Sequence, residues 1–233
     1  MKYSKVVTGK FIERPNRFIA RVEIDGKEET VHVKNTGRCC ELLVPNANVL
    51  LEVVNSPNRK TGYDLIAVYK GNTLINMDSY APNKVALEFI KNGGLFSRSA
   101  IIKPEYKYGN SRIDIYVQDG DTRALIEVKG VTLENEGVSM FPDAPTERGV
   151  KHVNELIKAV AQGYDCYLLF VIQMKGVCEF KPNYKTHRAF GEALQRAQKA
   201  GVKILAYDCI VTPDTLRIDV PVSVNLEKNN GEA

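Results

Sequence analysis

Long apolar segments are missing from this chain of 233 residues. The longest uninterrupted apolar run, Cys166 to Ile172, has seven residues, whereas a membrane-spanning helix needs ~20. The first residues, MKYSKVVTGKFIERP, contain no apolar signal-peptide segment. We therefore expect a cytoplasmic protein without a membrane partner. With 44% hydrophobic and 26% charged residues, the composition also excludes a disordered or fibrous chain.

Paired cysteine motifs are absent as well. The five cysteines are an odd number, and no two of them have the spacing Cys-x-x-Cys. This pattern argues against a structural zinc site and against a disulfide framework. Because Cys166 and Cys209 lie within apolar, strand-like runs, we expect buried free thiols in a reducing compartment.

Positive charge is only slightly in excess, with a net charge of +4 for the whole chain, but it is unevenly distributed. Residues 1–22 hold six basic side chains and one acidic side chain, a local balance of +5. Three aromatic residues alternate with these charges, a mixture that can pair with phosphates and stack on bases. A solvated strand face with its aromatics in the core is the alternative. For phosphate contacts the candidates are Arg14, Arg17 and Arg21.

Residues 1–80 are predicted to form a small barrel of about five strands, similar to an OB-fold, which commonly binds oligonucleotides. An alternating run up to Ile24 is followed by the turn residues Asp25-Gly26. The other expected strands are Glu29 to Lys34, Leu42 to Val44, Val49 to Val54 and Tyr63 to Tyr69. Small polar residues after one strand are candidates for phosphate or sugar contacts, although a plain turn explains them equally: Asn35, Thr36 and Arg38.

Residues 81–226 are predicted to form a mixed α/β domain with the order αβββαβαβ. Its expected helices are Lys84 to Lys91, Thr146 to Gln162 and Thr186 to Ala200. The expected strands are two or three between Ile101 and Val131, then Cys166 to Ile172 and Val202 to Tyr207. Residues 227–233 are expected to be a disordered tail.

The most informative segments are RIDIYV, residues 112–117, and ALIEVK, residues 124–129. A two-residue turn at Gly120-Asp121 would pair 113 with 128, 115 with 126 and 117 with 124, and all six residues are apolar. On the other face this register sets Asp114 opposite Glu127, and Arg112 opposite Lys129. The alternation predicts one core face and one polar face.

Opposed carboxylates on paired strands destabilise a sheet unless a cation lies between them. Two oxygen donors of this kind suit Mg²⁺ or Mn²⁺, which keep several waters and bind substrate phosphates. Lys129, on the same face as Glu127, could then orient a water or offset charge on a phosphate. The alternative is that Asp114 and Glu127 form ordinary ion pairs with Arg112 and Lys129, worth ~0–1 kcal/mol each.

Asp114 followed by Glu127-x-Lys129, within this element order, resembles the PD-(D/E)xK nuclease superfamily with its restriction-endonuclease-like fold. The segments KYGNSRID (107–114), IEVKGVTL (126–133), FPDAPTERGVKH (141–152) and NTG (35–37) together resemble the sugar fermentation stimulation protein A family over essentially the full length. That family is regarded as DNA-binding, with an OB-like domain before a nuclease-like domain.

The resemblance implies roles for individual residues. Asp114 and Glu127 match the metal ligands, with Val128, the residue after Glu127, counted in the metal site, and Lys129 matches the catalytic lysine. Glu88 matches the acid that the first helix often adds, and Glu105 is a rival for that role. Ile113 stands where the motif has proline.

The helix that begins near residue 146 carries three further candidates for binding a phosphate at its positive end. A solvated helix face is the alternative interpretation of this set, which with Arg112 completes the predicted nucleic-acid contacts: Arg148, Lys151 and His152.

Two functions follow. The first is a DNA-binding protein with a nuclease site that uses Mg²⁺ or Mn²⁺. The alternative is a DNA-binding transcriptional regulator of sugar metabolism without catalytic activity. RNA is a weaker candidate partner than DNA, and a homodimer is compatible with the sequence. Sequence specificity and physiological pathway are not encoded in any pattern we recognise.

Overall fold

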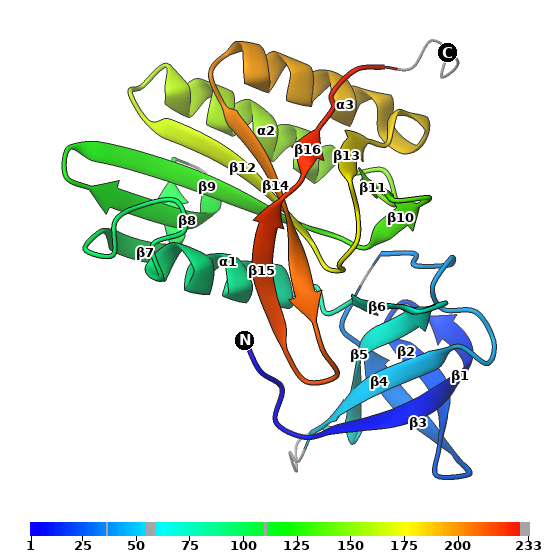
Figure 1. Ribbon diagram of the computed structural model, residues 1–233. Coiled ribbons are helices and arrows are strands. Elements are labelled where there is room, and N and C mark those ends of the chain that lie inside the picture. Colours follow the sequence, from blue (N-terminus) through cyan, green and yellow to red (C-terminus); the bar gives the residue numbers. More distant parts are fainter. Residues whose placement is uncertain (36, 55–58, 110, 229–233) are drawn as a thin grey trace.

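Alternating apolar side chains close the first sheet into a barrel (Figure 1). The computed structural model describes residues 1–35, 37–54, 59–109 and 111–228. In this sheet the strand order is β3-β2-β1-β4-β5-β6, and a parallel pairing of β3 with β5 closes five strands into a ring. The strands are β1 (Val6–Asn16), β2 (Ile19–Ile24), β3 (Lys27–Val33), β4 (Asn48–Val53), β5 (Tyr63–Lys70) and β6 (Thr73–Asn76). The predicted OB-like barrel is confirmed.

Two details of the barrel differ from the prediction. Leu42 and Leu43 are buried, but their backbone amides both donate to Cys39 O, so this segment is a turn and the predicted strand at 42–44 is wrong. Strand β1 was not among the predicted strands, although a solvated strand face was the alternative interpretation of the basic segment. Of the aromatics in the basic segment, Tyr3 and Phe11 are buried, whereas Phe18 is exposed.

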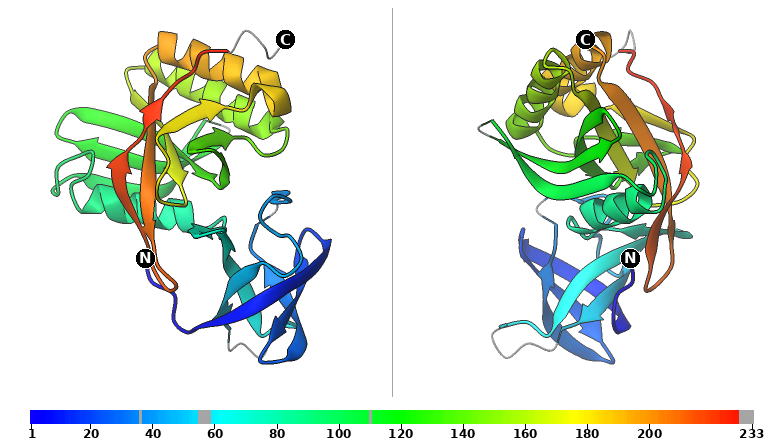
Figure 2. Two further views of the ribbon diagram at one scale, coloured as in Figure 1. Left: turned by 45° about the vertical axis from the view of Figure 1, so that its right-hand side comes forward. Right: turned by 90° about the vertical axis from the view of Figure 1, so that its left-hand side faces the viewer.

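A mixed six-stranded sheet forms the centre of the second lobe, in the order β15-β14-β12-β9-β8-β7. Helix α1 covers one face, while α2 and α3 cover the other (Figure 2). The helices are α1 (Ala81–Lys91), α2 (Glu147–Val160) and α3 (Tyr184–Lys199). The strands are β7 (Ile101–Tyr108), β8 (Ser111–Asp119), β9 (Thr122–Val131), β12 (Asp165–Ile172), β14 (Lys203–Val211) and β15 (Leu216–Pro221). Along this sheet the predicted order αβββαβαβ is confirmed, and one further strand that was not predicted, β15, follows it.

A second, four-stranded sheet was not predicted, because its strands are too short to show a period. It has the order β10-β11-β13-β16 and contains β10 (Leu133–Asn135), β11 (Val138–Phe141), β13 (Glu179–Pro182) and β16 (Ser223–Val224). The loop after β11 leads into α2 and forms one wall of the cleft described below.

The apolar run at Cys166 to Ile172 lies in β12, between parallel neighbours β9 and β14. A strand with helices on both sides of its sheet has no solvated face, which explains why it lacks polar alternation. The buried thiols of Cys166 and Cys209 lie in this sheet as expected, and all five cysteines are free.

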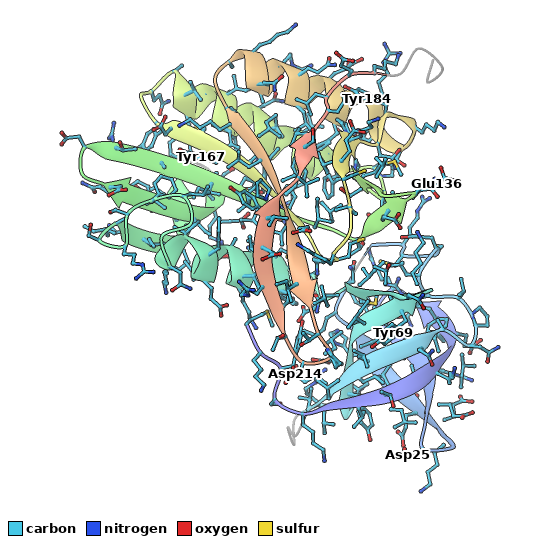
Figure 3. The ribbon with its side chains drawn as sticks, in the orientation of Figure 1. Asp25, Tyr69, Glu136, Tyr167, Tyr184 and Asp214 are labelled. Carbon is cyan, nitrogen blue, oxygen red and sulfur yellow. The ribbon has the colours of Figure 1, made fainter. Side chains whose placement is uncertain are left out.

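Hydrogen bonds join the two lobes at several places. Gln173, just after β12, donates from Nε2 to Asn76 Oδ1 at 2.8 Å and to Asp78 O at 3.1 Å. The turn between β14 and β15, marked by Asp214 in Figure 3, accepts a bond from Tyr3 N at 2.8 Å. The described part of the chain contains no helix with the length and apolar character needed to cross a membrane. The predicted tail lies largely outside the described residues, which end at 228.

Candidate functional site

The β8–β9 hairpin has the predicted register at its turn end. The pairs from Asp119 with Thr122 to Ile115 with Ile126 all obey it. The ladder then ends, and the amide of Val128 donates to the Asp114 side chain instead of to a strand carbonyl. The strands therefore separate at Asp114, and the predicted direct opposition of Asp114 and Glu127 is not part of the ladder.

The prediction of one apolar and one polar face is wrong, because both faces of the hairpin are covered. Ile115 and Ile126 pack against α1, whereas Tyr116 and Leu125 pack in the cluster on the α2 side. Ile113 packs on the α2 side too, so the alternation of β8 changes face at Asp114.

Asp114 is held by two neutral donors. Its Oδ1 accepts from Asn83 Nδ2 at 2.9 Å, and its Oδ2 accepts from Val128 N at 2.8 Å. Asn83 lies in the first turn of α1, directly after Pro82. The site thus joins the start of α1 to the point where β8 and β9 separate.

Glu127 is the most buried carboxylate of the site, with 1% of its surface exposed. Its Oε1 accepts from Lys129 Nζ at 2.6 Å and forms a short hydrogen bond with His152 Nδ1. Its Oε2 is buried and has no hydrogen-bond partner among the described residues. A buried, unsatisfied carboxylate oxygen is costly, so this atom needs a cation or a hydrogen-bond donor.

The two carboxyl groups have opposite pKa shifts. Burial, with the charge of Glu127, raises the pKa of Asp114 above its usual value. Burial also acts to raise the pKa of Glu127, but hydrogen bonds from His152 and Lys129 and the Lys129 charge outweigh it, so this pKa is lowered. Glu127 therefore stays ionised, and Asp114 carries the excess negative charge that a cation would relieve.

His152, on α2, was predicted to hold a phosphate, but it is 9% exposed and faces Glu127. Arg148 Nε donates to His152 Nε2 at 3.4 Å, so Nδ1 carries the proton that is given to Glu127. Lys151 points away, with its side chain 63% exposed and Nζ 3.9 Å from Glu155. The three residues therefore do not form one phosphate site.

The two acids proposed to complete the metal site lie elsewhere. Glu88 Oε2 forms an ion pair at 2.6 Å with the amino terminus of Met1. Glu105 lies within the regular β7–β8 register with a positive φ of 53°, and its side chain pairs with Arg112 Nε at 2.7 Å. Both assignments are wrong, and Arg112 pairs with Glu105 rather than lying opposite Lys129.

The residue that α1 does bring to the site is Asn83. Glu88 lies five positions after Asn83, which corresponds to a rotation of about 140° around the helix axis. Sequence reasoning missed Asn83 because nothing distinguishes an amide in a first helical turn until its neighbour across the sheet is known.

The barrel candidates have different environments. Arg14 donates to four backbone carbonyls, those of Arg17, Asn35, Gly37 and Arg38, so its guanidinium fastens the loop after β3 and is not free for a phosphate.

Arg17 and Arg21 remain exposed. Arg17 lies over the Phe18 ring at 5.1 Å, and Arg21 pairs with Glu13 and Glu28 at 3.3 and 3.4 Å. Thr36 lies outside the described residues.

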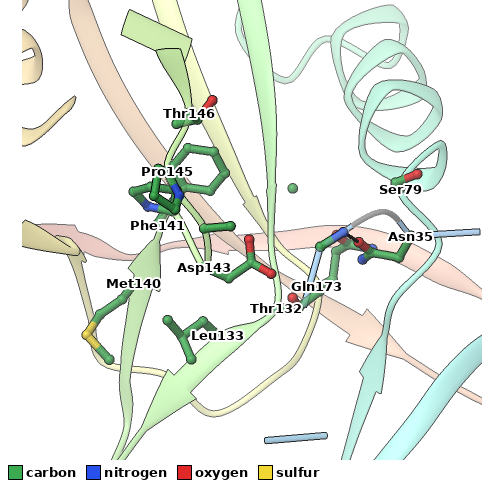
Figure 4. A pocket seen from close by; sticks show the side chains of 14 residues that line it. Asn35, Ser79, Thr132, Leu133, Met140, Phe141, Asp143, Pro145, Thr146 and Gln173 are labelled. Atoms are coloured by element: carbon green, nitrogen blue, oxygen red, sulfur yellow. Dashed lines mark hydrogen bonds between the residues drawn. The ribbon is translucent and has the colours of Figure 1, made fainter. Parts of the chain in front are cut away.

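A cleft of about 350 Å³ separates the barrel loop from the second lobe (Figure 4). Asp143 and Pro145 lie on one side of it, with Asn35 and Ser79 on the other. Asn35 is anchored by a bond from its Nδ2 to Met77 O, and the amide of Arg38 donates to Asp143 Oδ2 at 3.0 Å.

The cleft adjoins the carboxylate site through two short connections. Gly130, which follows Lys129, lines it, and Pro82, which precedes Asn83, packs against Gly130. A β-carbon at Gly130 would lie 2.5 Å from Gln173 Oε1 and 2.6 Å from Pro82 Cγ, so this junction requires glycine.

The donors at the site fit a hard divalent cation. Asp114 and Glu127 offer carboxylate oxygens, and Glu127 Oε2 has no protein partner among the described residues. The described residues contain no group of three or more His, Cys, Asp and Glu side chains arranged for a metal. A cation held here would thus keep water or substrate oxygens in its remaining positions, as Mg²⁺ does.

Comparisons with known proteins cover nearly the whole chain. The SfsA N-terminal OB domain matches residues 12–77, and the sugar fermentation stimulation protein RE domain matches residues 80–215. A sugar fermentation stimulation protein homolog of Desulfitobacterium hafniense is 58% identical, covering 97% of this chain and 99% of its own. One from Clostridium beijerinckii is 56% identical over 97% and 100% of the two chains. The solved structure of Pyrococcus furiosus SfsA in complex with Ca²⁺ has a TM-score of 0.86 at 27% identity, covering 97% of this chain and 98% of that one.

Proposed function

The chain belongs to the sugar fermentation stimulation protein family, and from that premise we propose that it binds DNA and hydrolyses phosphodiester bonds at Asp114, Glu127 and Lys129 with a bound Mg²⁺ or Mn²⁺. Among the features that support this proposal, one carries it: Glu127 Oε2 is buried beside a second carboxylate and has no hydrogen-bond partner in the described part of the chain.

Each residue of the site has a separate task in this proposal. Asp114 and Glu127 would hold the cation, which when bound supplies Lewis acidity to a phosphoryl oxygen. Lys129, whose Nζ lies 2.6 Å from Glu127 Oε1, places a positive charge where a phosphate gains negative charge. Asn83 fixes Asp114 by donating to Oδ1.

His152 is a positioning residue in this account. Its proton on Nδ1 occupies Glu127 Oε1, which leaves Oε2 as the free oxygen. Arg148 holds the imidazole from its other nitrogen. Metal-binding side chains are commonly oriented by such second hydrogen bonds.

A related protein supports the choice of ligand. The Pyrococcus furiosus structure is a complex with Ca²⁺, a hard divalent cation that oxygen ligands bind. We transfer to this chain only the expectation that a divalent cation binds, and we place it at the carboxylates.

The test is a nicking assay on supercoiled and single-stranded DNA. We expect cleavage in Mg²⁺ or Mn²⁺, none in EDTA, and a loss of at least 100-fold for Asp114→Ala. Asp121→Ala is the matched control, because Asp121 lies exposed at the turn of the same hairpin. If Asp114→Ala cleaves like the wild type, the nuclease assignment is wrong.

A DNA-binding protein without catalysis is the second candidate. One observation favours it: Lys129 and His152 already provide hydrogen bonds to Oε1 of Glu127 without a cation. On this alternative, DNA affinity would be the same in EDTA and in Mn²⁺, and no substrate would be nicked.

A further inference from the structure

We propose that the ring of Tyr80, together with that of Phe18, is a stacking platform for unpaired bases, so that the DNA taken by this protein is single-stranded. The inference rests on the proposed function and extends it by naming the substrate class.

Tyr80 is the most exposed of the large apolar side chains in the described part of the chain, at 65%. Its backbone is nevertheless fixed, because its amide donates to Asp78 Oδ1 at 2.9 Å and the next two residues, Ala81 and Pro82, are buried. Asp78 is itself buried and paired with Lys34 at 2.9 Å. An aromatic ring held in solvent by a rigid backbone loses little entropy when it stacks on a ligand.

Along the chain, Tyr80 lies between a residue that lines the cleft and a residue that contacts Asp114. Ser79, immediately before it, lines the cleft. Asn83, three residues after it, donates to Asp114. The first turn of α1 contains no acidic residue that would repel a phosphate. A strand whose base stacked on Tyr80 would therefore carry its backbone toward Asp114 and Glu127.

Phe18 is the second exposed aromatic, at 48%, and it carries the charge that a nucleic acid requires. The guanidinium of Arg17 lies 5.1 Å from the centre of its ring, so a stacked base would have a cation beside its phosphate. The other aromatics of the basic segment, Tyr3 and Phe11, are buried and cannot stack.

Hydrogen bonds bring the chain segments that carry the two rings to the end of β3. Phe18 O accepts from the amide of Val33, the last residue of β3, and Lys34 O accepts from both the amide and the hydroxyl of Ser79. Phe18 and Ser79, the residue before Tyr80, are thus bonded to consecutive residues of the chain.

Base stacking on an exposed ring selects strand state. A duplex keeps its bases stacked on one another, so these rings would find no free base face, whereas any single strand offers one. The barrel alone does not select single strands, because it could bind the phosphate backbone of a single strand or of a duplex.

The experiment measures affinity by fluorescence anisotropy in EDTA, with the full chain, a labelled oligothymidine and a duplex of equal length. We expect Tyr80→Ala and Phe18→Ala each to weaken single-strand binding about 5- to 100-fold and to leave duplex binding unchanged. Tyr80→Phe should bind like the wild type, because it keeps the ring. The matched control is Ile101→Ala, which removes a side chain that is 56% exposed on β7.

Three results would overturn the proposal: wild-type affinity in both alanine variants, equal losses for single strand and duplex, or tighter binding of a matched oligouridine than of DNA. Because affinity is measured without metal, failure here leaves the nicking assay of Asp114→Ala intact. Conversely, absent cleavage with a Tyr80-dependent affinity would reject the nuclease and retain the stacking platform.

Discussion

Asp114 and Glu127 belong to one hairpin, but they accept hydrogen bonds from different kinds of donor. Among the described residues, Glu127 has two donors on one oxygen and none on the other, while Asp114 has one neutral donor on each oxygen. Their residue types and spacing were readable in the sequence. The donors were not, because His152 lies 25 residues from Glu127 and Asn83 lies 31 residues from Asp114 along the chain.

Arg14 illustrates a limit of charge patterns. The cluster of basic residues near the start of the chain predicts contacts with phosphates, and Arg17 keeps an exposed guanidinium that such a contact needs. Arg14 instead donates hydrogen bonds to four backbone carbonyls of its own chain. The net charge of a segment does not reveal which of its cationic side chains already bind other groups of the protein.

A pH-dependent prediction concerns Asp64 in the barrel. Burial acts to raise the pKa of this carboxyl, but hydrogen bonds from Arg59 and His32 and the charges of Arg59 and Lys34 lower it overall. A carboxyl with a lowered pKa in the folded state stabilises the fold above its ordinary pKa, and the effect disappears as acid protonates it.

Asp64→Asn should therefore reduce the free energy of unfolding at pH 7 by about 2 kcal/mol. The difference from the wild type should shrink as the pH falls below ~4. Urea unfolding at a series of pH values measures both. A difference that stayed constant down to pH 2 would show that the ion pairs of Asp64 do not stabilise the barrel.

At the scale of elements, turn residues and apolar runs predicted the features that depend on neighbouring residues in the chain. Gly120-Asp121 fixed the register of the β8–β9 hairpin, because a two-residue turn leaves one pairing for the strands that follow. The apolar run of β12 marked a strand buried on both faces. Strand β1 escaped prediction, and the face of α1 that meets the sheet was misassigned through Glu88, because helix phase relative to a sheet is set by packing and not by local pattern.

Helix α2 supplies the prediction at this scale. Its N-cap, Thr146, accepts from Gly149 N through Oγ1 at 3.1 Å, and the helix carries both Arg148 and His152. Thr146→Ala should lower the free energy of unfolding by about 1 kcal/mol, since the amide of Gly149 loses its acceptor. Thr146→Ser retains that acceptor and should remain within ~0.5 kcal/mol of the wild type. Equal losses in the two variants, measured by urea unfolding, would count against a capping role.

At the scale of the molecule, the two lobes meet where the function is proposed to occur. Gln173 and Arg38 join them by hydrogen bonds on either side of the cleft, and the carboxylates lie just beyond Gly130. In the proposed function, a nucleic acid contacts Arg17 and Phe18 on the barrel and the carboxylates on the second lobe, so binding and cleavage together require both lobes. The small net charge of the chain thus averages two regions with different tasks.

Anomalous diffraction from crystals of the wild-type protein soaked in Mn²⁺ shows whether Asp114 and Glu127 hold a divalent cation. We expect one strong peak bounded by oxygens of Asp114 and Glu127, with Glu127 Oε2 among them, and the loss of that peak in Glu127→Gln. An empty position at saturating Mn²⁺, or a peak that persists unchanged in Glu127→Gln, would rule out this cation site.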